Sequence, residues 1–203
     1  MHILPILEKK TELYGGISVA KKSDFKRCSE IWGSSLKTSS EQEGSYPSTD
    51  INKSIVFVIK RQPFRDSFSS TKRDFLNNAF IIGLVELFHV LDEVEIRALV
   101  VDKKYRQDGF GEALLIASIE QSLIWSAITM SLEVRVSNDI VISLYRKYGF
   151  FIVGNRKQYY EDTKEDAFIM KLPRLNSIEF QKTFQGLVKR HRIEVTKHLI
   201  MDN

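Results

Sequence analysis

The fold is decided by the stretch VEIRALVVDKKYRQDGFGEALL, residues 94–115. Its β-branched, apolar beginning predicts a strand over 93–102. A polar loop with two glycines follows over 103–111, and a helix without breakers is predicted over 112–126. Glycine lets backbone N–H groups approach a ligand closely, and a helix start carries partial positive charge. The stretch therefore predicts a strand, loop and helix that hold a phosphate or pyrophosphate. Taken alone, a glycine-containing turn without a ligand explains the loop as well.

The other predicted elements extend from this unit toward both ends of the chain. Helices are predicted from Phe25 to Leu36 and over 139–148. Strands are predicted over 17–20, 54–60, 79–90, 129–136, 150–153 and 167–172. The turn at Leu91-Asp92 pairs two strands antiparallel, and polar loops fill 37–50 and 62–78. The order β-α-β-β-β-α-β-α-β-β predicts a single α/β domain with a mixed, mostly antiparallel sheet flanked by helices.

A change of composition near Pro173 divides the chain into a domain over 1–173 and a basic, helical extension over 174–203. The cations of the extension fit a solvated helix face, or a weak contact with RNA phosphates at a ribosome. They are Lys182, Lys189, Arg190, His191, Arg192 and Lys197.

Composition excludes several classes of protein. Cys28 is the single cysteine, so an intramolecular disulfide and a cysteine-based zinc site are both excluded. No histidine-containing metal constellation stands out, and we expect no metal. The longest apolar stretch, 80–90, is interrupted by Gly83 and Glu86, so we expect no membrane partner. The net charge of +4 favours an anionic cofactor or partner. We expect a reducing compartment, either the cytoplasm or, given few alanines beside many Ile, Lys, Phe and Ser, a plastid stroma.

Two motifs together resemble a known family. The run 94–115 resembles the acetyl-CoA-binding strand, loop and helix of the GNAT superfamily. LEVRVSN at 132–138 and LYRKYGF at 144–150 resemble the ribosomal-protein alanine N-acetyltransferases and related protein N-terminal acetyltransferases. The second resemblance continues through Arg156, Tyr159-Tyr160 and Met170, so the likeness covers about residues 79–172.

The resemblance implies acetyl-CoA as co-substrate and a set of residues that bind it. Backbone at Leu99, Val100 and Val101 pairs with the pantetheine arm, Arg106 flanks the loop, and Asn138 contacts the arm. Backbone amides hold the pyrophosphate at Gln107, Asp108, Gly109, Phe110, Gly111, Glu112 and Ala113. Both loop glycines are expected to be needed for close backbone approach. Val100, Val101 and Ala113 also fit an ordinary core role.

The resemblance further implies that Tyr145 is the catalytic acid and Glu133 the catalytic base. Direct transfer needs a neutral amine and an acid that protonates the leaving sulfur. A carboxylate in the apolar strand around Glu133 is costly unless it faces polar surroundings. From residues alone, Glu133 also fits an exposed strand face, and Tyr145 fits simple packing.

Two tyrosines, Tyr159 and Tyr160, are expected to line the acceptor slot and bind substrate backbone, or else to cover a sheet edge. Glu95 and Arg97 of the preceding strand are candidates for the same slot.

The favoured function is acetyl transfer to a primary amine, foremost the α-amine of a protein N-terminus. Such an amine has a pKa of about 8, whereas that of lysine is about 10.4, so it needs less help to lose its proton. The alternative acceptor is a lysine, a polyamine or an antibiotic amine. A non-catalytic acetyl-CoA-binding module is the alternative from a different class, which the presence of Tyr145 and the loop glycines disfavours.

Overall fold

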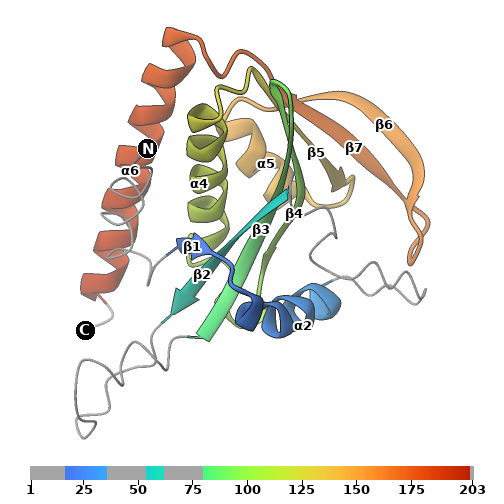
Figure 1. The fold of residues 1–203 in the computed structure, drawn as a ribbon, viewed down its shortest axis with the longest axis vertical. Helices are drawn as coiled ribbons and strands as arrows, with labels where there is room; N and C mark the ends of the chain where they lie inside the picture. Colours follow the sequence, from blue (N-terminus) through green and yellow to red (C-terminus); the bar gives the residue numbers. More distant parts are fainter. Residues whose placement is uncertain (1–16, 36–53, 62–79, 202–203) are drawn as a thin grey trace, which may run out of the picture.

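A computed structural model of the protein describes residues 17–35, 54–61 and 80–201. Its seven strands form one sheet in the order β1-β2-β3-β4-β5-β7-β6 (Figure 1). The strands are β1 (Ile17–Val19), β2 (Ser54–Arg61), β3 (Phe80–Val90), β4 (Glu93–Val101), β5 (Thr129–Arg135), β6 (Phe151–Tyr160) and β7 (Glu165–Leu172). The α-helices are α2 (Phe25–Ser35), α4 (Phe110–Ile124), α5 (Asp139–Lys147) and α6 (Ile178–Met201), with short 3-10 turns η1 (Lys22–Asp24) and η2 (Lys103–Tyr105). The predicted loops 37–50 and 62–78 lie outside the described residues.

The sheet is mixed, as the sequence predicted. β4 and β5 pair in parallel, and the other neighbouring strands pair antiparallel. The hairpin between β3 and β4 turns at Leu91-Asp92, with Val90 opposite Glu93. The α/β fold class and the predicted element order are confirmed.

Helices cover both faces of the sheet. α4, α5 and α6 lie on one face and α2 lies on the other (Figure 1). The main core, between the sheet and α4, includes Leu114, Leu132 and Met170. A second, smaller cluster joins Cys28 and Ile31 of α2 to the opposite face.

Glycine at position 83 allows α4 to approach β3. A Cβ on Gly83 would lie 2.9 Å from the carbonyl oxygen of Val100 and 3.2 Å from Cδ1 of Leu114. A Cβ does not fit at 2.9 Å from a backbone oxygen, and 3.2 Å from Leu114 is a tight contact, so a larger residue would require β4 to shift and Leu114 to give way. This contact sets the position of the helix that follows the glycine loop.

α6 packs on the main core rather than lying apart from it. Phe184 and Val188 are buried in that core, and the Phe184 ring meets the edge of Tyr148 at a centroid distance of 6.2 Å. Lys182, Lys189, Arg190 and Arg192 are exposed, as expected for a basic helix face. His191 departs from that expectation, because it is 2% exposed and faces the core. The side chain of Lys197 lies outside the described set.

β6 is longer than the predicted strand over 150–153, because it continues to Tyr160. Residues 155–158 are exposed, since β6 is the edge strand and neither of its faces is fully covered. Their polar sequence therefore resembles a loop. Among the described helices, none has the length and apolar character needed to cross a bilayer.

Candidate active site

The pairing between β4 and β5 ends about halfway along the two strands. Their parallel pairing runs from Glu93 opposite Thr129 to Ile96 opposite Leu132, although both strands continue beyond that point. On its other side, β4 pairs Ile96 with Leu87 and Ala98 with Glu86, which leaves Arg97 as an extra residue. A bulge of this kind bends its strand and strengthens the local twist, so it directs the end of β4 away from β5.

The end of β4 thus has one edge that no described strand pairs with. Leu99 and Val100 are half-buried there, and Val101 is buried. Backbone N–H and C=O groups along such an edge are available to an extended ligand with amide groups. This arrangement fits the pairing predicted for Leu99, Val100 and Val101.

The loop between β4 and α4 is held by its own hydrogen bonds. Asp102 Oδ1 accepts from the backbone N–H of Lys104 at 3.1 Å, and Asp102 Oδ2 accepts from Arg27 Nη2 at 2.7 Å. Arg106 Nε donates to the carbonyl oxygen of Val101 at 3.0 Å, which folds this side chain along the end of β4. Arg106, Gln107 and Asp108 are exposed, so a ligand can reach the loop.

Gly109 begins α4 with a left-handed backbone, φ 80°. That conformation is free of strain for glycine and costly for most other residues. The first N–H groups of the helix, at Phe110, Gly111 and Glu112, have no carbonyl partner within the helix, so they are available to donate to an anion. Gly111 shows no backbone strain that would require glycine, and its part in the close approach of a ligand stays a prediction. A Cβ there would lie 3.8 Å from Cγ2 of Val101, an ordinary contact, and its φ is not positive.

Glu112 uses its side chain to join three helices. Its Oε1 accepts from Lys147 Nζ at 2.7 Å and from the Tyr148 hydroxyl at 2.5 Å, and its Oε2 lies 3.5 Å from His191 Nδ1 of α6. Burial acts to raise the pKa of Glu112, but these neighbours outweigh burial and hold that pKa below its usual value. The side chain is therefore structural, which leaves the backbone N–H of Glu112 for the ligand. Ala113 is buried, and its own N–H donates to the carbonyl oxygen of Gly109 at 3.0 Å.

Asn138 caps α5 as predicted, since its Oδ1 accepts from the backbone N–H of Val141 at 3.4 Å. It is exposed at the end of β5, and its contact with a cofactor arm stays a prediction.

Tyr145 lies on α5 and is buried, with its ring 5.5 Å from the ring of Phe150. Burial raises the pKa of its hydroxyl well above the usual value, and the nearby Tyr160 raises it further. Within the described part of the chain, no hydrogen bond involves this hydroxyl. Tyr145 therefore holds its proton throughout the neutral and mildly alkaline range, as a proton donor must.

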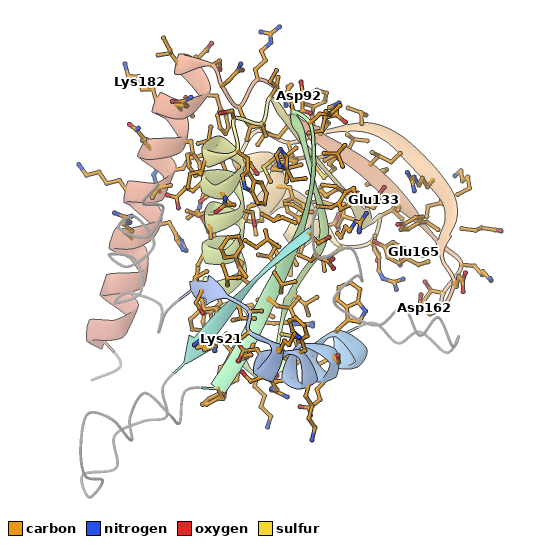
Figure 2. All side chains as sticks on the ribbon, viewed as in Figure 1. Lys21, Asp92, Glu133, Asp162, Glu165 and Lys182 are labelled. Atoms are coloured by element: carbon orange, nitrogen blue, oxygen red, sulfur yellow. The ribbon has the colours of Figure 1, made fainter. Side chains whose placement is uncertain are left out.

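Glu133 lies on β5 immediately after its pairing with β4 ends. Figure 2 shows it on the side of the sheet away from α4, with Asp162 and Glu165 beyond it at the β6–β7 turn. Burial raises the pKa of Glu133, Arg156 opposes that rise, and Glu95 adds to it. Arg156 Nη2 lies 3.3 Å from Glu133 Oε1. A carboxylate with a raised pKa is better matched to proton transfer near neutral pH.

Tyr159 and Tyr160 are the last two residues of β6. Their rings meet edge to face at 5.2 Å, and the Arg156 guanidinium lies 5.4 Å from the centre of the Tyr159 ring. Glu133 and Glu95 both help to raise the pKa of Tyr159, although burial is the larger cause. Tyr159 thus lies near Glu133 and Glu95, and the role of Tyr159, Tyr160 and Glu95 in an acceptor slot stays a prediction.

Arg135 fixes the β6–β7 hairpin that carries these tyrosines. Its Nη2 donates to both oxygens of Asp162 at 2.8 Å, and its Nη1 lies 3.2 Å from Glu165 Oε2. Its guanidinium also covers the Tyr160 ring at 3.8 Å. Sequence reasoning assigned no role to Arg135 or Arg156, because their acidic partners lie more than twenty residues away in the chain. No group of three His, Cys, Asp or Glu residues within 17–35, 54–61 and 80–201 is placed to hold a metal ion.

Residues 36–150 match the acetyltransferase (GNAT) family, which is more than half of the chain. The protein belongs to the GNAT family. It is 42% identical over 86 residues to the [ribosomal protein bS18]-alanine N-acetyltransferase of Escherichia coli K12, a match that covers 41% of this chain and 58% of the relative. It is 38% identical over 92 residues to an N-alpha-acetyltransferase of Sulfurisphaera tokodaii, over 45% of this chain and 54% of that relative.

A solved GNAT structure has the same fold. The crystal structure of the ribosomal-protein-S18-alanine N-acetyltransferase from Escherichia coli aligns with a TM-score of 0.62 and 27% identity, over 78% of this chain and 92% of that one. The chain spans less than two thirds of the length of the curated GNAT relatives that it matches.

Proposed function

We propose that this protein is an acetyl-CoA-dependent N-acetyltransferase whose acceptor is the α-amine of a protein N-terminus. The observation that carries the proposal is the position of Glu133 directly after the last β4–β5 pair, together with the buried hydroxyl of Tyr145 on the following helix. Tyr145 belongs to the core on the α4 face, and Glu133 lies on the opposite face. Tyr160 helps to raise the pKa of Tyr145, and Glu133 helps to raise the pKa of Tyr160, so Tyr160 is near enough to each of them to affect or feel its charge.

The residues present fit acetyl-CoA. The unpaired edge of β4 offers backbone groups to an amide-containing arm, and the start of α4 offers N–H groups to a pyrophosphate. Gly109 leaves that approach unobstructed by a side chain. When bound, acetyl-CoA supplies the acetyl group as a thioester.

The chain's own residues then account for the proton movements. Glu133, directly or through a water molecule, takes the proton that the amine loses as its nitrogen bonds to the acetyl carbon. Tyr145 donates its hydroxyl proton to the sulfur as the carbon–sulfur bond breaks. Tyr159 and Tyr160 border the path of the incoming amine, and Arg135 keeps Tyr160 in place.

Two arguments favour an α-amine over a lysine side chain. The α-amine has a pKa of about 8 and the lysine amine one of about 10.4, so a single carboxylate suffices to deprotonate the former near neutral pH. The relatives are named for alanine N-acetylation of a ribosomal protein and for N-alpha acetylation.

The exposed cations of α6 support a weak contact with RNA, as a ribosome-associated enzyme would make. If they bind phosphates, affinity for a short duplex RNA should fall steeply with salt. Replacing Lys182, Lys189, Arg190 and Arg192 with glutamine should remove that binding. Equal RNA affinity of the substituted protein would contradict the contact.

The proposed function is tested by incubating the full chain with acetyl-CoA and three kinds of amine. These are unblocked peptides that begin with Ala or Ser, an N-terminally blocked peptide that carries lysine, and spermidine. Mass spectrometry with fragment assignment should locate acetyl groups on the α-amine of the unblocked peptides. Acetylation confined to lysine or to spermidine would reject the α-amine and support the alternative acceptor.

A further inference from the structure

Glu86 is a carboxylate in an otherwise apolar strand, and the mechanism above does not use it. It lies in the middle of β3, FIIGLVELFHV, and is 3% exposed. Its Oε1 is buried and has no hydrogen-bond partner among the residues that the structure describes. Nearly all buried polar groups in folded proteins are hydrogen-bonded, and a buried carboxylate without a partner is costly. Such a group in a native strand requires an explanation.

The strand pairing places Glu86 on the face of the sheet that α2 covers and on which Glu133 lies, called here the acceptor face. Side chains alternate between faces along a strand, so Glu86 shares its face with Leu84. Its cross-strand neighbours are Val56 on β2 and Ala98 on β4. Leu84, Val56 and Ala98 all belong to the cluster that packs under α2. Glu86 therefore lies on the α2 face, opposite α4 and on the same face as Glu133.

Glu86 and Glu133 flank the bulged segment of β4 from its two sides. Glu86 pairs with Ala98 beside the bulge at Arg97, and Glu133 follows directly after the last β4–β5 pair. Two inter-strand spacings separate them, which is on the order of 10 Å. Glu95 lies between them on β4, with Phe88 of β3 as its neighbour. Three carboxylates thus form a row across the acceptor face.

Two described cations of this face accompany the other two carboxylates. Arg156 lies 3.3 Å from Glu133, and Arg97 lies 3.6 Å from Glu95 while its guanidinium covers the Phe88 ring at 3.6 Å. Glu86 is the member of the row for which no ion pair is present among the described residues. A positive group brought by the substrate would complete the row.

We propose that Glu86 is a specificity-determining residue that binds a cationic side chain near the N-terminus of the acceptor. The inference rests on the proposed function, because it takes the α-amine to lie at Glu133. An extended peptide advances about 3.3 Å per residue. The distance between Glu133 and Glu86 therefore corresponds to a cation on one of the first three residues of the acceptor.

A structural role and a binding role for Glu86 predict opposite effects on stability. If Glu86 stabilised the fold, Glu86→Leu would lower the melting temperature. If it is retained for binding, Glu86→Leu removes a buried carboxylate whose Oε1 has no partner among the described residues, and the melting temperature should stay the same or rise. Measuring this in the absence of substrate separates the two roles before any activity is considered.

The deciding experiment uses peptide pairs in which arginine is replaced by citrulline, its neutral isostere, at residue 1, 2 or 3. Neither side chain can be acetylated by this chemistry, so every product reports the α-amine. The full chain should prefer arginine at one of the three positions. Since a hydrogen bond to a charged group is worth about 1.5–3 kcal/mol, the ratio of kcat/KM for arginine over citrulline should be about tenfold or more. Glu86→Gln and Glu86→Leu should each bring that ratio close to one.

Glu93→Gln is the matched control. Glu93 is on the neighbouring strand, exposed, and paired with Lys171 at 3.0 Å, away from the row. The Glu93→Gln substitution removes the same charge as Glu86→Gln and should leave the arginine-to-citrulline ratio of kcat/KM unchanged. Transfer to α-amines with no preference for arginine at any position, or an equal preference in Glu86→Gln, would overturn the proposal for Glu86 while leaving the proposed function intact. Absence of transfer to any α-amine would reject the proposed function itself.

Discussion

Replacing Tyr145 with phenylalanine removes one hydroxyl group and keeps the ring that packs against Phe150 at 5.5 Å. The hydroxyl takes part in no hydrogen bond among the described residues, so its removal leaves no partner unsatisfied. We therefore expect the free energy of unfolding to change by less than about 1 kcal/mol. The aromatic packing, which carries most of the side chain's contribution to stability, is retained.

The expected effect on catalysis is much larger. A positioned acid contributes roughly 100- to 10,000-fold to a rate, which corresponds to about 2.7–5.4 kcal/mol of transition-state stabilisation. The loss should appear in kcat, because the proton is transferred during reaction and not on binding. Since burial keeps the pKa of Tyr145 far above its usual value, the wild-type rate should not fall at mildly alkaline pH through loss of this proton.

Three measurements check the Tyr145 prediction. Release of free thiol at saturating acetyl-CoA gives kcat, calorimetry gives the affinity for acetyl-CoA, and thermal unfolding gives stability. Tyr148→Phe is the matched control, because the Tyr148 hydroxyl donates to Glu112 at 2.5 Å and its loss should cost about 1–3 kcal/mol of stability. The control should thus lose stability and largely keep kcat. Full turnover by Tyr145→Phe would refute the assignment of Tyr145 as the acid.

Three further predictions follow from the site and the fold. Glu133→Gln should lower kcat/KM most near neutral pH and less at higher pH, where more of the acceptor amine is already neutral; in the wild type the ionisation of Glu133 should lie above the usual range of a glutamate, because burial raises this pKa and activity needs the ionised form. Gly109→Val should weaken acetyl-CoA binding measured by calorimetry, because φ 80° disfavours valine. The Gly111→Ala protein should bind acetyl-CoA normally, because a Cβ at Gly111 has room beside its protein neighbours. Equal losses of affinity in the two variants would contradict the role given to Gly109. Phe184→Ala should destabilise the whole domain by about 3–5 kcal/mol, since the ring is buried in the main core. Gly186→Ala should not destabilise it, because a Cβ at Gly186 meets no neighbour. An unchanged melting temperature in Phe184→Ala would mean that α6 is an independent extension.

Most elements of the fold could be predicted from local sequence patterns. The β-branched strands, the cap at Asn138 and the two-residue turn at Leu91-Asp92 each depend on a few neighbouring residues, and all lie where the sequence predicts them. The loop from Arg106 to Gly111 could be predicted equally well, because a residue with left-handed backbone before a helix favours glycine. The grouping of Glu133, Tyr145 and Tyr159 came from the resemblance to a family and not from local chemistry.

The parts that sequence reasoning missed depend on distant partners. The extension of β6 was hidden because an edge strand need not alternate polar and apolar residues. Arg135 acquires its role from a hairpin turn more than twenty-five residues later. Two signals were present and unused. Phe180, Phe184 and Val188 recur at helical spacing and indicate a buried face of α6. Glu86 is a lone carboxylate in an apolar strand, the same pattern that drew attention to Glu133.

The bulge at Arg97 also bears on the solubility of the protein. By turning the end of β4 away from β5 it leaves a short row of backbone donors and acceptors inside the sheet, where a strand from another copy could pair. A ligand with amide groups that lies along β4 would fill that row as an additional strand does. Saturating acetyl-CoA should therefore raise the melting temperature and also slow aggregation on heating, and a fragment of coenzyme A without the pantetheine arm should protect much less.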